Sequence, residues 1–435
     1  MDIVEIITKK RDGEELSREE IKFFIDGVMA ETIKREQIGA LLMAITLNGF
    51  SASECFYYAD ALASSGNRYY LGDKNPKFVD KHSTGGVSDA CTLVVLPALA
   101  ALGYKIAKYS TSGVGASFGT LDRLSVFSGY KPVLSDEEFY NCLDTVGFSI
   151  IGNNKKIIPA DSKLYEIRKQ TGTVPSLPLI AASIMSKKLA IGTKAVVLDI
   201  KCGEGSLLTD VKQAEELAKL MVQIGKSAGI KTTAIISNMN QPLGKNIGPM
   251  LEVKEAVELL SAKRGTNLTD LYNLCREMVA HIMIASGDVK SRAVAYDRFD
   301  KVIKSGQALK KLEAMIEAHG GDASSLHDIS KLVPKANEIF VSADKSGYIF
   351  DIDTKKLYEA INYIGSDGGK TVNPNVGVEV MVREGDKVMA GDKLAKIYYS
   401  ISDPSFATAV QFIRGCFEIK KVKPELENLI YKVIV

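Results

Sequence analysis

The first part of the chain repeats apolar and polar positions with the period of an α-helix. Between Ile21 and Met29 the apolar side chains recur at spacings of three and four residues, typical of one buried helix face. Ser17 and Glu20 precede this run at the spacing of a capping box, in which each side chain satisfies a backbone donor at the helix start. Two more helices are expected, at residues 36–47 and 52–65.

From about residue 77 the pattern changes to short apolar segments separated by longer helical ones. This alternation predicts an α/β arrangement, a sheet with crossover helices that is at least partly parallel. Residues 163–192 interrupt it with a helix-rich piece, which we expect to fold back onto the N-terminal helices. Strands are expected near residues 78–79, 105–109, 195–198 and 234–236, and helices near 92–102, 210–228 and 252–262.

Strand patterning dominates the last part of the chain. Val378, Val380 and Val382 recur at a period of two, residues 383–386 form a turn signal, and residues 394–399 read as a second strand. The sequence therefore predicts a small β-rich C-terminal lobe.

Composition limits the function classes. At 435 residues the chain exceeds what one hydrophobic core usually serves, and its 46% apolar and 25% charged residues are ordinary for a globular protein. No apolar stretch reaches the roughly 18 residues of a membrane span, and the acidic start lacks a secretory pattern, so we expect a cytoplasmic protein without a membrane partner. A net charge of +2 gives no general field for nucleic acid, and the cysteines and histidines lack the spacing of a disulfide scaffold or zinc site.

The strongest local signal lies at residues 80–89, between a predicted strand and an apolar helix. Two adjacent glycines let the backbone curl so that N–H groups and the helix start point into one concavity, which favours an anion. Lys81 adds a positive charge, and the hydroxyls of Ser83, Thr84 and Thr92 can donate to phosphate oxygens. A solvated glycine-rich turn explains the pattern equally well, and the lysine of a Walker A loop is missing.

A second glycine-rich segment spans residues 110–122, after the next predicted strand. Two such loops that follow neighbouring strands converge at the carboxyl end of a sheet, where α/β proteins bind ligands. Ser110 and Thr120 can then complete a phosphate cage. Alone this is weak, because loops rich in serine and glycine are common.

These segments resemble the thymidine phosphorylase and pyrimidine-nucleoside phosphorylase family, and the resemblance extends in family order over essentially the whole chain. The segments that carry it are residues 81–87, 119–124, 164–168, 176–189, 199–205, 238–244 and 383–386.

The resemblance implies reversible phosphorolysis of nucleosides such as uridine, deoxyuridine, thymidine or a modified analogue, with inorganic phosphate as co-substrate. A 2,4-dioxo pyrimidine offers two carbonyl acceptors beside one N3–H donor, which suits two cations and a hydroxyl that either accepts or donates. Ser183 and Lys187 are four residues apart and share one helix face. By resemblance, the phosphate ligands are Lys81, Ser83, Thr92, Ser110 and Thr120, the catalytic residues are His82, Arg168 and Lys187, and the substrate contacts are Lys108, Tyr165, Arg168, Ile180, Ser183 and Lys187.

In the reaction so implied, Arg168 and Lys187 stabilise negative charge on the departing base, and His82 donates a hydrogen bond or a proton to its O2. Lys108 resembles the lysine of the broad-specificity branch, which implies that ribosides are accepted alongside deoxyribosides. The walls around base and sugar would be Tyr165, Val174, Ile180 and Leu207, although core packing explains the last three equally well.

No organic cofactor is implied, but the family binds a monovalent cation, as a structural potassium ion, mainly through backbone oxygens. Glu255 is the one side-chain ligand among the matching positions. These positions are Ser88, Ala90, Leu243, Asn246 and Glu255.

The second loop departs from the family pattern. Ser112 stands where arginine is expected, Ala116 replaces histidine, Phe118 replaces glycine and Ser125 replaces glutamate; in the first loop Ser88 stands for a glycine. We hypothesise that an ion pair bracing the second loop is absent as a unit. Since Ala116 removes a large side chain near the substrate and Phe118 adds one, a reshaped pocket with an altered base or sugar preference is expected.

The implied architecture is α/β in class: an all-α domain, a larger α/β domain with a mixed sheet, and a β-rich C-terminal lobe, with the site in a cleft between the α and α/β domains. A homodimer through the helical domain is implied as well. Two alternatives remain open, a phosphoribosyltransferase of the anthranilate type and a non-catalytic nucleoside-binding protein. The expected divisions are residues 1–65 with 163–193, residues 66–162 with 194–333, and residues 334–435.

Overall fold

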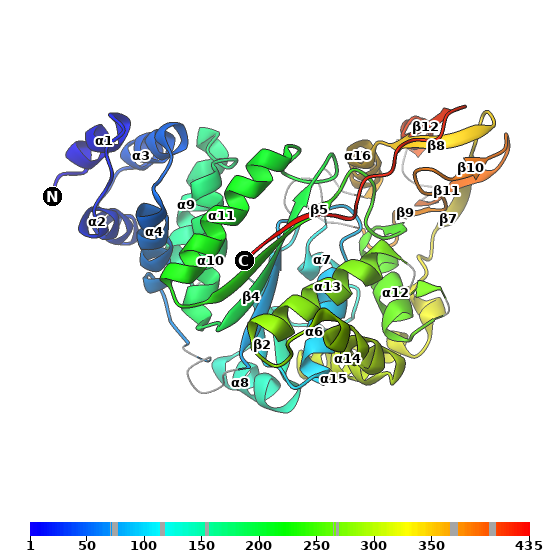
Figure 1. Cartoon of the computed structure of the whole chain (residues 1–435), viewed down its shortest axis with the longest axis horizontal. Coiled ribbons are helices and arrows are strands. Elements are labelled where there is room, and N and C mark those ends of the chain that lie inside the picture. The colour runs from blue at the N-terminus through cyan, green and yellow to red at the C-terminus, as the bar shows by residue number, and fades with distance from the viewer. Residues whose placement is uncertain are drawn as a thin grey trace.

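The structure is a computed structural model in which three regions follow one another across the molecule (Figure 1). Helices occupy the N-terminal end, a sheet lies at the centre, and a β-rich lobe forms the opposite end. The fold class expected from the sequence is confirmed. The described residues are 1–69, 71, 77–113, 118–152, 156–263, 265–266, 269–365, 373–399 and 406–435.

The helical region joins two segments that are distant in the sequence. The capping box is confirmed at the start of the second helix, where Ser17 Oγ accepts from Glu20 N at 3.2 Å. The later helix pair packs against the N-terminal helices, as expected from the sequence. The helices are α1 (Ile3–Arg11), α2 (Arg18–Met29), α3 (Arg35–Asn48), α4 (Ala52–Ser64), α9 (Pro159–Thr171) and α10 (Leu177–Ile191).

The central sheet is mixed and has the order β1-β4-β5-β13. Its first three strands are parallel, and the last pairs antiparallel with β5. Every residue of β4 is buried, as expected for a strand covered on both faces. The strands are β1 (Val79–Ser83), β4 (Ala195–Cys202), β5 (Lys231–Asn238) and β13 (Ile430–Ile434).

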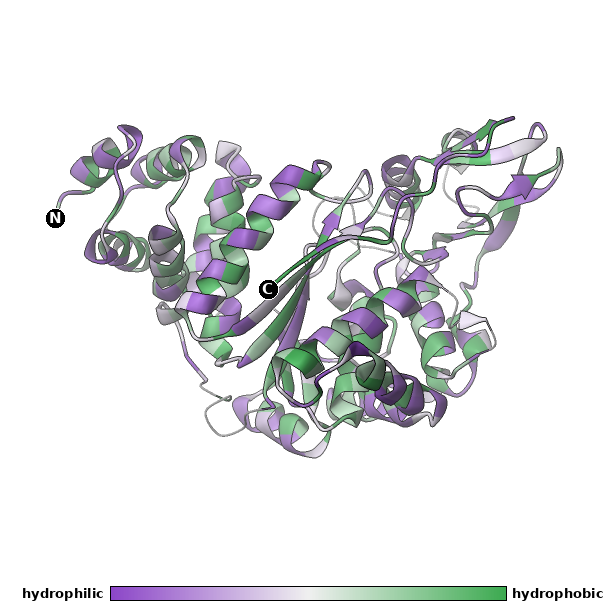
Figure 2. Ribbon diagram, in the orientation of Figure 1, coloured by the Kyte–Doolittle hydropathy of each residue, from purple (hydrophilic) through white to green (hydrophobic). Residues whose placement is uncertain are grey.

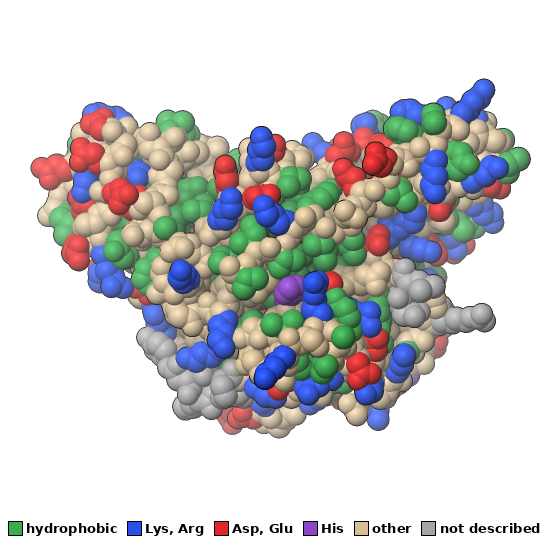
Figure 3. All heavy atoms as spheres, in the orientation of Figure 1, with side chains coloured by type: hydrophobic (Ala, Val, Ile, Leu, Met, Phe, Trp, Pro, Cys, Tyr) green, Lys and Arg blue, Asp and Glu red, His purple; other side chains and the backbone are tan. Residues whose placement is uncertain are grey.

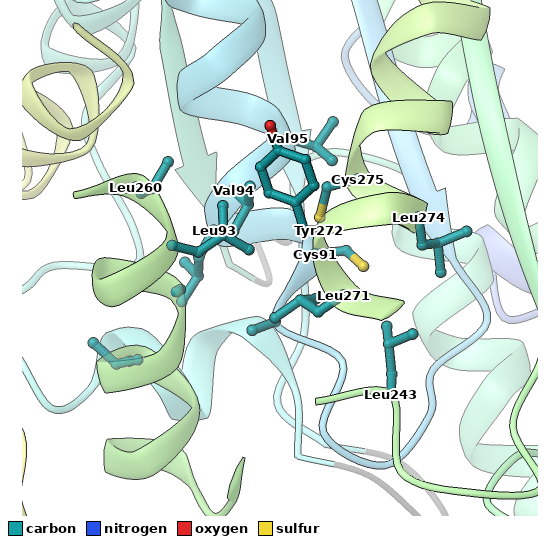
Figure 4. Packing of buried hydrophobic residues seen from close by; sticks show 14 of the residues in the cluster. Cys91, Leu93, Val94, Val95, Leu243, Leu260, Leu271, Tyr272, Leu274 and Cys275 are labelled. Carbon is teal, nitrogen blue, oxygen red and sulfur yellow. The ribbon is translucent and has the colours of Figure 1, made fainter. Parts of the chain in front are cut away.

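Alternation along β4 divides the molecule into two hydrophobic cores. Val197 packs with the helices α6 and α13, whereas Val196 and Leu198 pack with α10, α11 and α4 on the other face. Figure 4 shows the first of these cores, in which side chains of α6 meet those of α13. Figure 2 shows apolar and polar bands alternating along α11, which buries one side against the sheet. The bounds are α6 (Cys91–Ala101), α11 (Val211–Ser227) and α13 (Asp270–Ala285).

A small parallel sheet of β2 and β3 lies beside β1. Further helices complete the α/β region, and no helix in the described ranges combines the length and apolar character that crossing a bilayer requires. The elements are β2 (Ile106–Tyr109), β3 (Phe148–Ile151), α7 (Thr120–Leu124), α8 (Asp136–Thr145), α12 (Pro249–Leu260), α14 (Arg292–Lys304), α15 (Gln307–Ala318) and the 3-10 turns Ser324–Leu326 and Ile329–Leu332.

The C-terminal lobe contains antiparallel strands, and it is tied to the α/β region twice. Its sheet β6-β9-β11-β7 takes β6 from the α/β region, and β13 returns from the lobe to the edge of the central sheet (Figure 1). The three-domain division stays a prediction, and the structure adds that residues 430–434 belong to the central sheet. The elements are β6 (Asn246–Ile247), β7 (Asn337–Ser342), β8 (Gly347–Ile352), α16 (Thr354–Gly365), β9 (Gly377–Val380), β10 (Lys387–Val388), β11 (Lys393–Tyr399), α17 (Phe406–Arg414) and β12 (Phe417–Lys420).

Candidate active site

The first glycine-rich loop connects β1 to α6 by a tight reversal. Thr84 N donates to Asp199 O at 3.0 Å, which fixes the loop to β4. Gly85 and Ser88 both have left-handed backbone conformations, with φ of 93° and 60°. A serine rarely adopts that conformation, and Ser88 is held in it by a 2.5 Å hydrogen bond from its Oγ to Asn246 O.

The Ser83 hydroxyl, a predicted phosphate ligand, already has a partner. It donates to Asp89 Oδ2 at 2.6 Å, and the other carboxylate oxygen accepts from Cys91 N at 3.1 Å. Burial opposes ionisation of Asp89, but the charges of Lys201 and Lys81 hold its pKa well below the usual range. An ionised Asp89 accepts only, so Ser83 must rotate away from it to donate to a phosphate oxygen.

The charges of four lysines act on His82. Burial lowers the pKa of His82 well below 6.5, and the charges of Lys108, Lys188, Lys187 and Lys81 lower it further, so the imidazole is neutral at pH 7. Its Nδ1 is buried and has no hydrogen-bond partner among the described residues. A cluster of this charge favours an anion at the same position.

Three of these lysines are fixed in place. Lys81 Nζ lies 3.4 Å from Thr92 Oγ1, which brings two predicted phosphate ligands together. Lys108 Nζ donates to Lys81 O at 2.7 Å, and burial lowers the pKa of Lys108 well below its ordinary value. Lys188 forms an ion pair with Asp80, both side chains being fully buried, and this pair joins α10 to β1.

The second loop is closed by a carboxylate. Asp122 Oδ2 accepts from Gly113 N and Gly119 N, each at 2.7 Å, which draws the two ends of the loop together. Thr120 is the buried first residue of α7, and the partly buried Ser110 follows β2, where its N donates to Ile151 O at 2.9 Å.

The departures in this loop have separate structural outcomes. Ser112 is exposed, and Ser125 Oγ donates to Asp122 O at 2.7 Å. Phe118 is buried against Tyr358 of α16, with ring centroids 5.2 Å apart, so its ring packs on the C-terminal lobe. The expected reshaping of the pocket stays a prediction, and Ala116 lies outside the described residues.

A buried ion pair braces the end of this loop from a neighbouring residue. Arg123 Nε donates to Glu252 Oε2 at 2.6 Å, and both side chains are buried. The pair attaches α7 to α12. An Arg–Glu ion pair therefore supports this loop, formed by Arg123 and Glu252 rather than at positions 112 and 125.

Ser183 and Lys187 lie on one face of α10, as their spacing predicts. Lys187 Nζ donates to Ser183 O at 2.9 Å and to Ser183 Oγ at 3.2 Å. Both side chains also contact Asp161 Oδ2 of α9, each at 2.8 Å. Although burial opposes it, the charge of Lys187 lowers the pKa of Asp161, which is therefore an acceptor.

Arg168 is held by the segment that connects α9 to α10. Its guanidinium donates to the carbonyls of Thr173, Leu179 and Val174 at 3.4, 3.4 and 2.7 Å and lies 5.6 Å from the centroid of Tyr165. Since a guanidinium has five N–H groups, two remain for a ligand.

Both predicted sets affect His82, because the charges of Lys81 from the phosphate set and Lys187 from the base set lower its pKa. Lys187 Nζ lies 5.9 Å from the ring centroid of Tyr109 at the end of β2, and its charge acts on His82. Among the expected walls, Ile180 is buried, Val174 is partly buried and Leu207 is half exposed.

Sequence reasoning missed the carboxylates of the site. Asp89, Asp161 and Asp80 each hold a predicted ligand or a neighbouring lysine. Asp80 and Asp89 lie within the first glycine-rich segment but received no role there, and Asp161 stands in a polar stretch of helix without a local signal. Asp89 and Asp199 also lie close to Cys91, but Lys201 Nζ approaches Asp199 Oδ2 at 2.7 Å, so an ammonium group already supplies the positive charge there.

The positions expected to hold a cation lie together beside Gly244. A Cβ atom at Gly244 would collide with Ser88 Oγ and Glu255 Oε2, so only glycine leaves room for these oxygens. Glu255 accepts from Lys245 N at 2.9 Å and from Asn246 N at 3.1 Å. Asn246 Oδ1 is buried and has no hydrogen-bond partner among the described residues. An all-oxygen set with one unsatisfied acceptor fits a monovalent cation.

The remaining two positions contribute backbone carbonyls nearby. Leu243 O accepts from Arg383 Nη2 at 2.7 Å, and Ala90 O accepts from Leu93 N at 3.0 Å at the start of α6. A carbonyl oxygen has two lone pairs, so both retain one for a further partner.

On the face visible in Figure 3, basic and acidic side chains are interspersed.

Comparison with known proteins gives matches to both the helical and the α/β regions. The α/β domain of a glycosyl transferase family matches residues 75–309, and the helical bundle domain of a glycosyl transferase family matches residues 4–66. Two relatives named pyrimidine-nucleoside phosphorylase, from Geobacillus stearothermophilus and Bacillus subtilis (strain 168), are each 39% identical over 401 residues, which is 92% of this chain and 92% of theirs. Anthranilate phosphoribosyltransferase from Thermus thermophilus shares the fold, with a TM-score of 0.60 at 19% identity over 74% of this chain and 100% of that one.

Proposed function

This chain belongs to the pyrimidine-nucleoside phosphorylase family, and from that premise we propose that it catalyses the reversible phosphorolysis of pyrimidine nucleosides to free base and pentose 1-phosphate. One observation carries the proposal. Side chains suited to a pyrimidine edge, Arg168, Ser183 and Lys187, come from the helical region, and the anion loop with Lys81 comes from the sheet; the charges of Lys187 and Lys81 both act on His82.

In the proposed reaction, a phosphate oxygen attacks the anomeric carbon while the bond to the base nitrogen breaks. The bonding electrons move to the base, and the N–H groups of Arg168 and Lys187 meet the charge that develops on its oxygens. This contact grows towards the transition state, so it accelerates the reaction rather than only tightening binding.

His82 acts as a neutral donor in this scheme. A neutral imidazole carries one N–H, which can donate to the base O2. A bound phosphate dianion would offset the charges of Lys81, Lys108 and Lys188 and so raise the pKa of His82. Substrate binding itself then makes proton donation by His82 easier.

Phosphate is held by Lys81, Ser83, Thr92, Ser110 and Thr120 in this proposal. The 3.4 Å approach of Lys81 Nζ to Thr92 Oγ1 supports the set on the first loop. Lys108 is tied to Lys81 O and so supports the loop next to the sugar, consistent with acceptance of ribosides and deoxyribosides.

A potassium ion beside Gly244 would be held by oxygens of Ser88, Ala90, Leu243, Asn246 and Glu255, and when bound it would supply a fixed positive charge that keeps this turn closed. Because Ser88 belongs to the first loop and its carbonyl accepts from Gly244 N at 3.2 Å, the ion would steady that loop.

We further propose a homodimer formed through the helical region. Val4 on α1 and Met43 and Leu47 on α3 are exposed apolar side chains, which supports a contact surface there.

The test is a panel of uridine, deoxyuridine and thymidine incubated with phosphate, with release of the base followed by ultraviolet absorbance. Release that depends on phosphate supports the proposal. Uracil release from uridine 5′-monophosphate that requires magnesium and pyrophosphate, without release from the nucleosides, would instead indicate a phosphoribosyltransferase. Ligand-induced stabilisation without any release would indicate a binding protein.

A further inference from the structure

Asp161 is the common partner of two side chains that face the base in the proposed function. Its Oδ2 accepts from Ser183 Oγ and from Lys187 Nζ, each at 2.8 Å. The side chain is only 13% exposed and belongs to α9, whereas its two partners belong to α10. Asp161 therefore fixes the positions of Ser183 and Lys187 relative to each other. It lies outside residues 164–168 and 176–189, the nearby segments that carry the family resemblance.

The hydrogen atoms around Ser183 can be assigned from these contacts. Asp161 offers only lone pairs when ionised, so the Ser183 hydroxyl proton points to Asp161. Lys187 Nζ, which has only protons to offer, donates to Ser183 Oγ at 3.2 Å and uses one of its lone pairs. What remains on Ser183 is one lone pair, so the hydroxyl can accept from a ligand but cannot donate to it.

We propose that Asp161 is a specificity-determining residue that makes Ser183 a hydrogen-bond acceptor and so restricts the site to pyrimidines that carry N3–H between two carbonyl groups. The inference rests on the proposed function and resolves its open point, whether Ser183 accepts or donates. Arg168 keeps two N–H groups for a ligand. The three N–H groups of Lys187 contact Asp161 Oδ2, Ser183 O and Ser183 Oγ, so Lys187 donates to the base by releasing Ser183 O. The protein then presents donor, acceptor and donor to the base.

A 4-aminopyrimidine mismatches this pattern at two places. Its unprotonated N3 places a lone pair against the Ser183 lone pair, and its amino group places N–H against a cationic donor. A site built around hydrogen bonds rejects an analogue that leaves its polar groups unpaired more strongly than an apolar pocket rejects a change of size. Uracil is therefore expected to bind roughly a hundredfold more tightly than cytosine, or more.

Two substitutions at this position separate the acceptor from the charge. Asp161→Ala removes the acceptor, frees the Ser183 proton, and is expected to reduce the preference for uracil over cytosine at least tenfold. Asp161→Asn keeps an oxygen at the same place, so it should retain most of the preference. Ser183→Ala should also reduce the preference, and adding Asp161→Ala to it should change the preference no further.

The measurement is the ratio of dissociation constants for cytosine and uracil in the full-length protein with phosphate present, by calorimetry, with folding of each variant checked by its thermal midpoint. A merely structural Asp161 would weaken both bases in proportion and leave the ratio unchanged, which overturns the proposal. If Asp161→Ala does not fold, the proposal is tested by the cytosine-to-uracil ratio of dissociation constants in Ser183→Ala and in the unmodified protein. An unmodified protein that binds both bases equally refutes the inference alone, whereas one that binds neither base and releases none refutes the proposed function with it.

Discussion

The two sides of the candidate site differ in how their charges are held. At the sheet side, two ion pairs are completely buried: Asp199 with Lys201 in β4, and Asp80 of β1 with Lys188, which reaches it from α10. On the helical side, Lys187 and Asp161 retain about a seventh of their exposure, 14% and 13%, and Arg168 is held by neutral carbonyls. Buried charges cannot move without a large penalty, so the sheet side is fixed by the fold, while the helical side keeps donors for a ligand.

The largest expected effect, on the free energy of unfolding, follows from removing one partner of a fully buried ion pair. Lys188→Ala leaves the Asp80 carboxylate buried without its partner, which should lower the free energy of unfolding by about 3–5 kcal/mol. Chemical denaturation measures this. Lys22→Ala removes one partner of an exposed pair, Lys22 with Asp26, and serves as the matched control, with little change expected. Equal losses in the two variants would show that burial does not distinguish these pairs.

Substitutions of the base-facing residues on the helical side should lower catalytic activity rather than stability. Lys187→Ala and Arg168→Ala each remove a donor to the departing base, so kcat/KM for uridine should fall by on the order of a hundredfold. The thermal midpoints should change much less than that of Lys188→Ala. Full activity in both variants would remove the assignment of these residues to the base.

The next effect concerns the turn at Gly244, which holds the first loop through the hydrogen bond from Gly244 N to Ser88 O at 3.2 Å. Exchanging potassium for tetramethylammonium should lower the thermal midpoint by a few degrees, since a bound ion stabilises the folded state by mass action. Glu255→Gln should abolish the difference between the two salts. A midpoint that is independent of the cation in the unmodified protein contradicts the proposed ion.

The smallest effect concerns His82 and acid. The folded pKa of His82 lies well below its ordinary value of 6.5, so the unfolded chain binds a proton that the folded chain refuses as pH falls through 6.5. This group therefore makes stability decline from pH 7 towards pH 5, and His82→Asn should make that decline shallower. Denaturation at several pH values without phosphate measures it, and parallel curves for the two proteins would contradict it.

The sequence predicted what depends on local spacing. The capping box at Ser17 and the shared face of Ser183 and Lys187 follow from helix geometry and are present. The pairing of Lys188 with Asp80 joins residues more than a hundred positions apart, and no local pattern indicates such a contact. Phe118 illustrates the same limit: its substitution was visible, but its partner Tyr358 belongs to another lobe.

Asp161 was missed for a related physical reason. Its partners lie on the next helix, 22 and 26 residues later, and a single acidic residue in a helix normally faces solvent. The resemblance identified the groups that would touch a ligand. It did not identify the group that orients them.

The position of β13 has a consequence for how the protein is made. β5 pairs with β13 on one edge, and residues 430–434 leave the ribosome after every other strand of that sheet. Until then, β5 presents a free row of backbone donors and acceptors, which is a template for pairing with another chain. During translation, the nascent chain therefore exposes an edge strand that can aggregate, until β13 pairs with β5 and covers it.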